Sequence, residues 1–287
     1  TTSTEITVPT DINGIIVDEI GDYGFKNCTT INSITIPSNI LNIGEYAFVG
    51  CTGLINATIP TTVNNVGDYA FKDCTGLVNV TISEGVENIG KGAFYNCVSL
   101  VEAVVPDTAN TVGAYAFYNC NSMTTATIGI TADAIGDYTF YGCEKLDTIV
   151  IGISVESIGD YAFYDCALTK VTVPAATKII GKYAFTNNTE MAKVTLRKGI
   201  ETIDNHAFEN CSSMQSINFP SSLLTIGNAT FKDCASLSTA TLPTSLTSLG
   251  YSAFENCSSL PKVTIPVGVT VINDKTFLNC TSLAEVI

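Results

Sequence analysis

Cysteine and histidine are the residues of this sequence that could support nucleophilic, redox or metal chemistry, and it has eleven cysteines and one histidine. Zinc sites need ligands in short pairs such as CxxC, and a catalytic thiol needs a neighbouring base. The cysteines instead recur every 23 residues in two runs: Cys28, Cys51, Cys74, Cys97, Cys120, Cys143 and Cys166, then Cys211, Cys234, Cys257 and Cys280. This spacing indicates a structural repeat, although a ladder of thiols could bind a soft metal.

The histidine does not suggest catalysis either. His206 stands at a repeat position that other units fill with tyrosine, such as Tyr69 and Tyr161, so we interpret it as a variant of that position. The glycines recur with the repeat and form no phosphate-binding loop. We therefore expect no catalytic residue, no cofactor and no metal site, and an enzyme of unrecognised type remains the less favoured alternative.

Acidic residues follow the repeated glycine in half of the units and offer a second possible chemistry. They are Asp22, Glu45, Asp68, Asp137, Asp160 and Asp274. A row of carboxylates could bind calcium, but lysine takes the same place in two units, as Lys91 and Lys182. The favoured interpretation is that these acids stand at helix starts, where the helix dipole attracts negative charge.

The charge of the chain narrows its possible partners. Thirteen basic against 27 acidic residues leave a formal charge of −14, which disfavours nucleic acid and anionic membrane surfaces. No stretch approaches the roughly 18 apolar residues of a membrane-spanning helix, so we expect no membrane insertion. The first residues lack the pattern of a leader peptide, so the protein is either cytosolic or its leader has been removed.

A repeated phenylalanine defines the units that must position all these residues. It recurs at Phe25, Phe48, Phe71, Phe94, Phe117, Phe140, Phe163, Phe185, Phe208, Phe231, Phe254 and Phe277, with one interval of 22 residues. In that interval Leu168 follows Cys166 one residue early. A period of 20 to 29 residues is typical of leucine-rich repeats. We predict a single domain over residues 1–287, with a degenerate capping strand at 1–14 and repeats at 15–287.

Each unit begins with a pattern of a half-buried strand. Ala57 and Ile59 alternate with the polar Asn56 and Thr58, and Pro60 then ends the strand because proline cannot donate to a ladder. Ser83, Gly129, Gly152 and Arg197 replace this proline in four units. Stacked units would pair such strands into a parallel sheet.

The second half of each unit has helical spacing. Val66, Ala70, Phe71 and Cys74 would fall on one face of about two turns. The residue before each cysteine is asparagine, aspartate or glycine, the types that tolerate a left-handed backbone. The sequence thus predicts a β-rich α/β solenoid, a leucine-rich-repeat horseshoe of about twelve units. A parallel sheet would form one face, and short helices or 3₁₀ turns the other.

The cysteine column is expected to be a buried, reduced ladder. Side chains in one column point the same way, which disfavours disulfide bonds between neighbouring units. Asn188 takes the place of cysteine in one unit, which suits a site where an amide can satisfy backbone groups.

Two strings of the repeat resemble the BspA-like class of leucine-rich repeats: Ile158-Gly-Asp-Tyr-Ala-Phe-Tyr-Asp-Cys166 and Ile217-Asn-Phe-Pro-Ser-Ser222. The resemblance extends from about Ile15 to the end of the sequence. It implies an extracellular or cell-surface protein whose non-enzymatic role is adhesion to host or matrix protein. It implies no catalytic residues, because the motif is a packing motif.

Two surfaces are candidate partner-binding sites for protein or, alternatively, glycan; the oligomeric state stays open. The exposed side of the strands carries a threonine column flanked by lysines, here Thr127, Lys170, Thr172, Lys193 and Thr195. The position after the repeated phenylalanine carries an aromatic stripe, Tyr95, Tyr118, Tyr141 and Tyr164. Threonine also favours strands in general, and the tyrosine rings could simply lean on one another.

Overall fold

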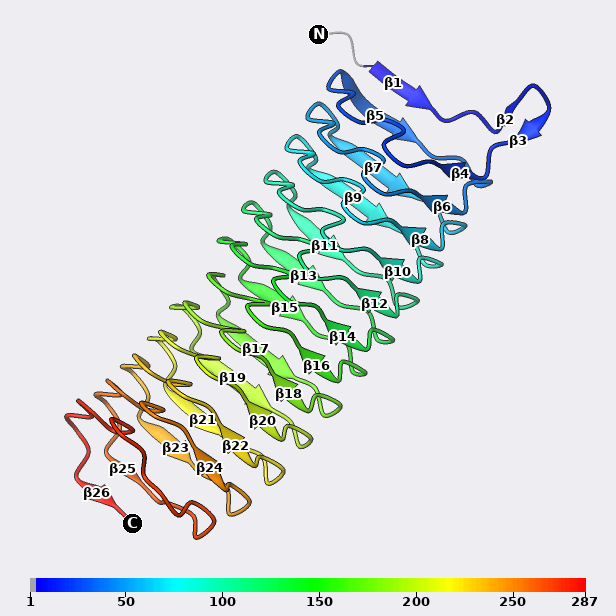
Figure 1. Cartoon of the computed structure of the whole chain (residues 1–287). Helices are drawn as coiled ribbons and strands as arrows, with labels where there is room; N and C mark the ends of the chain where they lie inside the picture. Colours follow the sequence, from blue (N-terminus) through cyan, green and yellow to red (C-terminus); the bar gives the residue numbers. More distant parts are fainter. Residues whose placement is uncertain (1–3) are drawn as a thin grey trace. The chain divides into compact units, whose positions relative to one another are not determined.

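A computed structural model describes residues 4–287 of the chain (Figure 1). Its contacts cluster into two compact units, Thr1–Leu146 and Asp147–Ile287, which are called the N-terminal and C-terminal units below. Each unit contains six of the repeated phenylalanines and is a β-solenoid of about six turns. Residues 1–3 of the predicted capping strand lie outside the described residues.

Each turn of the N-terminal unit contributes a first strand of three to five residues and a second strand of two. The first strands are β5 (Ile31–Thr35), β7 (Asn56–Ile59), β9 (Asn79–Ile82), β11 (Glu102–Val104) and β13 (Thr125–Thr127). The second strands are β4 (Glu19–Ile20), β6 (Asn42–Ile43), β8 (Asn65–Val66), β10 (Asn88–Ile89), β12 (Thr111–Val112) and β14 (Ala134–Ile135). Before them, β1 (Thr4–Thr7) pairs in parallel with β5, and β2 (Asp11–Ile12) with β3 (Ile15–Ile16) forms an antiparallel hairpin.

The C-terminal unit has the same two rows of strands (Figure 1). The first strands are β15 (Thr148–Val150), β17 (Lys170–Val173), β19 (Lys193–Leu196), β21 (Ser216–Asn218), β23 (Thr239–Thr241), β25 (Lys262–Val263) and β26 (Glu285–Val286). The second strands are β16 (Ser157–Ile158), β18 (Ile179–Ile180), β20 (Thr202–Ile203), β22 (Thr225–Ile226) and β24 (Ser248–Leu249). The sequence predicted the first row but not the second.

The first strands have the predicted alternation and register. In β7 the apolar Ala57 and Ile59 are buried, whereas Asn56 and Thr58 are exposed. The strand ends at Ile59, immediately before Pro60. Strand β7 pairs with β9 in parallel, with Thr58 opposite Thr81, so one repeat is one step of the ladder. Equivalent residues of neighbouring turns therefore form columns.

The prediction of short helices or 3₁₀ turns is wrong, because the described residues contain no helix. The segment that follows each second strand is a run of tight turns. Its successive backbone N–H groups donate alternately to the next repeat and back to a carbonyl of their own repeat. The Phe48 N–H donates to Ala70 O of the next turn at 2.7 Å, whereas the Val49 N–H donates back to Tyr46 O at 3.1 Å. A helix would keep all these hydrogen bonds within itself, whereas half of those in this segment join neighbouring turns of the solenoid.

Left-handed residues explain why the segment cannot be helical. The residue before the cysteine column has a positive φ in every unit, as predicted, for example 57° at Asp73. The tyrosine column also has a positive φ throughout, for example 55° at Tyr69, which the sequence did not predict because tyrosine rarely adopts it. Two left-handed residues four positions apart interrupt any helix.

The acids that follow the repeated glycine have a different role from the predicted one, since no helix is present for them to cap. Asp22 Oδ1 accepts the backbone N–H of Glu45 at 2.7 Å, and Asp68 Oδ1 accepts that of Lys91 at 2.7 Å. Asparagine does the same in another unit, where Asn205 Oδ1 accepts the Asn228 N–H. At Asp22, Asp68 and Asn205 this column therefore binds the backbone of the next turn, whether or not the side chain is charged.

The core of each unit is built from stacked columns. Phe71 is fully buried, and its ring stacks on those of Phe48 and Phe94 with centroids 4.8 Å and 5.2 Å away. The cysteines are all free, and ten are buried while Cys28 is half-buried, as the sequence predicted. Their thiols also donate across turns: Cys74 Sγ lies 3.1 Å from Phe48 O. Burial raises the pKa of the Cys143 thiol to about 12, so this thiol stays protonated at neutral pH.

Candidate functional site

Four of the nine predicted binding residues lie together on the sheet of the C-terminal unit. In the β17–β19 ladder Lys170 lies opposite Lys193, and Thr172 lies opposite Thr195. Their side chains are exposed except that of Thr195, which is half-buried. Side chains on this side of the strands alternate with the buried Val171 and Val173, so the sheet presents two lysines and two threonines as one patch.

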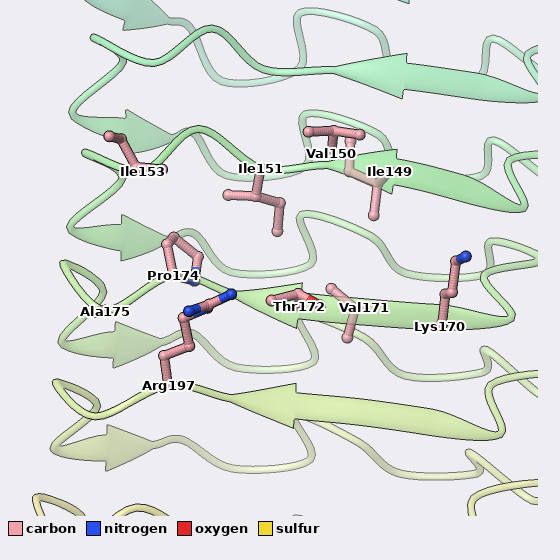
Figure 2. Close-up of a pocket in the computed structure, with 10 residues that line it drawn as sticks. All are labelled: Ile149, Val150, Ile151, Ile153, Lys170, Val171, Thr172, Pro174, Ala175 and Arg197. Carbon is pink, nitrogen blue, oxygen red and sulfur yellow. The ribbon is translucent and has the colours of Figure 1, made fainter.

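The ladder does not continue from β17 to β15. Strand β17 is the first member of the ladder β17-β19-β21-β23, to which β15 does not belong. The backbone N–H of Thr169 still donates to Asp147 O at 3.3 Å, at the start of the two strands. Beyond that point the strands part, and a hollow of about 500 Å³ opens between them (Figure 2).

We call this cavity the sheet-face hollow, and it combines an apolar lining with two cations. Ile149, Val150, Ile151 and Ile153 come from β15 and the turn after it, and Lys170, Val171, Thr172, Pro174, Ala175 and Arg197 complete the lining. Lys170 and Arg197 lie at opposite ends of the hollow, with Ile151 and Thr172 between them (Figure 2). Among residues 4–287 neither cation forms an ion pair, so both are available to a ligand.

Departures from the repeat make the hollow apolar. Val150 occupies the threonine column, Gly152 replaces the strand-ending proline, and Ile153 follows it. Val150 is 54% exposed and Ile153 is 70% exposed, which is unusual for large apolar side chains. The sequence analysis named Gly152 as a departure from the repeat but not Val150 or Ile153, although an apolar residue at a threonine position was a visible signal.

The charge distribution favours an anionic ligand at this place. Nine of the thirteen basic residues lie in the C-terminal unit, whereas the N-terminal unit has four. The acidic residues are spread over both units, fifteen in the first and twelve in the second. Lys170, Lys193 and Arg197 stand on successive strands or directly after them, so the most cationic part of the sheet borders the hollow.

The chemistry of the lining suits binding rather than catalysis. Its polar side chains are one hydroxyl, one ammonium and one guanidinium, and none of these is a general base at neutral pH. Among the described residues no group of three histidine, cysteine or acidic side chains could hold a metal ion. His206 lies elsewhere: its ring stacks on Tyr183 at 4.4 Å, and its Nδ1 lies 2.7 Å from Glu209 Oε2.

The other predicted residues lie outside the hollow. Thr127 is half-buried on β13 of the N-terminal unit. The tyrosine stripe lies in the turns after the second strands, with Tyr95, Tyr118 and Tyr141 in the N-terminal unit and Tyr164 in the C-terminal unit. All four rings are half-buried, and the Tyr118 ring stacks on those of Tyr95 and Tyr141 at 4.6 Å and 5.0 Å.

Comparison with known proteins identifies the repeat family of this chain. The profile of the BspA type leucine rich repeat region, six copies long, matches residues 2–124, 110–228 and 201–287. No curated protein sequence matches significantly. None of the described residues form a helix of the length and hydrophobicity that a membrane span requires.

Three solved structures illustrate the similarity. A leucine rich repeat protein of T. pallidum is 27% identical over 57% of this chain and 76% of its own, with a TM-score of 0.54. A leucine rich cell surface protein of Faecalibacterium prausnitzii is 24% identical, with coverage of 100% and 88% and a TM-score of 0.53. The pneumococcal vaccine antigen PcpA is 19% identical, with coverage of 99% and 77% and a TM-score of 0.58.

Proposed function

The chain belongs to the BspA-type leucine-rich repeat family, and from this premise we propose that it is a non-enzymatic binding module for a host or matrix protein. Repeat proteins of this family typically mediate protein binding and are typically associated with cell surfaces. In this role the chain would act as an adhesin, secreted or displayed on a cell surface.

The sheet-face hollow is the observation that carries the proposal. Its lining would bury an apolar side chain of a partner, while Lys170 and Arg197 would pair with acidic side chains of the partner next to that apolar one. Arg197 can hold a carboxylate through two parallel hydrogen bonds. Lys193, opposite Lys170, extends the cationic border onto the next strand. The expected partner segment is therefore acidic, with one exposed apolar side chain.

A binding experiment with charge-matched variants tests this proposal. The chain is measured against a panel of immobilised matrix proteins, with immobilised neutral and acidic glycans as a second arm. The double variant Lys170→Glu/Arg197→Glu should lower the affinity for the bound matrix protein at least tenfold. Ile153→Asp should lower it similarly, because a charge would enter the apolar lining. Higher salt should also weaken binding, because it screens exposed charges.

The control removes the same charge elsewhere. Lys182 and Lys275 are exposed and do not line the hollow, so Lys182→Glu/Lys275→Glu should bind like the unmodified chain. Equal loss in both double variants would mean that only net charge matters. Binding to glycans alone, or to no matrix protein, would contradict the proposed protein-binding role.

A further inference from the structure

The tyrosine column of the N-terminal unit has one gap. It holds Tyr23, Tyr46, Tyr69, Gly92, Tyr115 and Tyr138 in successive turns. Tyr46 and Tyr69 stack with centroids 5.1 Å apart, and Tyr115 and Tyr138 stack at 4.8 Å. Gly92, in the turn after β10 (Figure 1), therefore separates two aromatic stacks, and the edge of the Tyr69 ring lies over it.

The backbone does not require glycine at this position. Gly92 has a φ of 58°, while Tyr69 and Tyr115 have 55° and 62° in the same place of the neighbouring turns. The tyrosine ring is therefore missing without any change in chain path. A Cβ at Gly92 would lie 2.4 Å from Cε1 of Tyr69, so the edge of that ring covers Gly92. A ring is the far end of a flexible side chain and can turn aside for a ligand.

The gap is a pocket with a definite chemistry. It is an open depression of about 370 Å³, lined by Tyr46, Tyr69, Lys72, Lys91, Tyr95 and Tyr115 around Gly92. Lys72 Nζ lies 5.6 Å from the ring centroid of Tyr69 and 5.1 Å from that of Tyr95. Lys91 Nζ lies 5.7 Å from the centroid of Tyr115. Two ammonium groups thus lie over the aromatic rings that border the missing one.

These cations are conspicuous in an acidic unit. The N-terminal unit has only four basic residues against fifteen acidic ones, and two of the four line this pocket. Lys91 forms no ion pair with any of residues 4–287, and Lys72 has one exposed pair, with Asp73 at 4.0 Å. Such an exposed pair is weak, so both ammonium groups can be recruited by an anion.

We propose that the gap at Gly92 is a binding site for the pyranose ring of an acidic sugar. A pyranose presents C–H bonds on its faces, which suit the negative faces of tyrosine rings, and hydroxyl groups that tyrosine hydroxyls can bind. The Tyr69 ring, whose edge covers Gly92, turns aside so that the sugar ring can enter between it and Tyr115. The carboxylate of the sugar pairs with Lys72 and Lys91. This site is in a different unit from the sheet-face hollow and takes a different ligand.

Calorimetry with defined oligosaccharides tests the site. The probes are trigalacturonic acid, neutral galactotriose and a sulfated-tyrosine peptide. The chain should bind trigalacturonic acid, with an affinity at least tenfold above that for galactotriose. Gly92→Tyr places the residue of the neighbouring turns into the gap, so it should lower this affinity at least tenfold without lowering the melting temperature. Lys72→Gln/Lys91→Gln should lower it as well.

Lys26→Gln is the matched control. Lys26 stands in the same column as Lys72, and its Nζ lies 4.9 Å from the Tyr23 ring centroid outside the pocket. This variant should bind like the unmodified chain. The proposal is overturned if trigalacturonic acid does not bind, if Gly92→Tyr and the double lysine variant bind it unchanged, or if only the sulfated-tyrosine peptide binds. Binding to matrix proteins is measured in a separate experiment. A failure to bind them would therefore not change how the trigalacturonic acid result is interpreted.

Discussion

The side-chain oxygen of Asn188 accepts the backbone N–H of Leu168 at 3.2 Å, and this bond links the two irregularities of the repeat. In regular units the leucine N–H donates to the cysteine carbonyl three residues before it, as Leu77 does to Cys74 O at 3.0 Å. Leu168 follows Cys166 by only two residues, so this bond is impossible there. The unit that lacks a residue is therefore completed by the one unit that lacks the cysteine.

Substitution of Asn188 tests this coupling. Its Nδ2 also donates to Phe163 O and Phe185 O, both at 2.8 Å, and the residue is fully buried. Asn188→Ala should lower the free energy of unfolding by about 2 to 4 kcal/mol, because buried backbone groups lose their partners. Asn188→Cys should cost about 1 to 2 kcal/mol, since a thiol can donate to a carbonyl but is a poor acceptor for Leu168.

A compensating insertion provides the control. One glycine inserted between Ala167 and Leu168 restores the 23-residue interval, and combined with Asn188→Cys it should recover most of the lost stability in chemical denaturation. If Asn188→Cys alone is as stable as the unmodified chain, the bond to Leu168 contributes nothing.

Phe140→Ala should lower the free energy of unfolding by about 3 to 5 kcal/mol, because it leaves a cavity in a close-packed column. Phe140 is fully buried, and its ring stacks on Phe117 at 5.3 Å. Val267→Ala, at a side chain that is 98% exposed, should change the free energy of unfolding by less than about 0.5 kcal/mol. A loss below about 1 kcal/mol for Phe140→Ala would contradict the assignment of this column to the core.

Thiol labelling should follow burial. A thiol reagent at neutral pH should react with few cysteines of the native chain, and with all eleven after denaturation without reductant. Cys28 should react first, because it alone is half-buried. A shortfall of free thiols in the denatured, unreduced protein would show disulfide bonds and contradict the reduced ladder.

Stability should fall at alkaline pH. Burial raises the pKa of Cys143 from 9.0 to about 12, so the folded chain keeps a proton that the unfolded chain loses. This contribution is fully present below pH 9 and is lost as pH rises towards 12, by about 1.4 kcal/mol per pH unit for such a thiol. Denaturation curves between pH 8 and 11 would measure it, and Cys143→Ala should flatten the slope. An unchanged slope in that variant would argue against the buried, protonated thiol.

The tyrosine stripe stays a candidate binding surface, and one pair of variants distinguishes its roles. Tyr118→Ser/Tyr141→Ser should weaken partner binding or dimerisation if the stripe is a contact surface. Tyr118→Phe/Tyr141→Phe keeps the stacked rings and should keep the melting temperature within a few degrees. If the serine pair unfolds more easily yet binds normally, the rings are structural, and the threonine and lysine patch becomes the better candidate.

The prediction of a single domain over residues 1–287 is also open to measurement, since contacts cluster into two compact units. Thermal unfolding followed by calorimetry should give one transition if the chain behaves as one domain, and two if the units melt separately.

Much of the fold could be predicted from the sequence because a repeat encodes each position many times. The alternation of Asn56, Ala57, Thr58 and Ile59 predicted the first strand and its buried side. The asparagine and aspartate column predicted its left-handed backbone. Lys170, Thr172, Lys193 and Thr195 were predicted to share a surface because a fixed period implies columns. These features depend on local preference and on spacing, both of which can be read from the residues.

The remaining features depend on which atoms of neighbouring turns meet, and only the tertiary structure decided them. Helical spacing in Val66 to Cys74 did not produce a helix, because hydrogen bonds between turns hold Tyr69 and Asp73 in left-handed conformations. The hollow beside Lys170 exists because β15 and β17 part although their sequences would pair. The period of the sequence predicts which residues stack. Whether a backbone N–H donates within its own turn or to the next turn is decided only when the turns pack against each other.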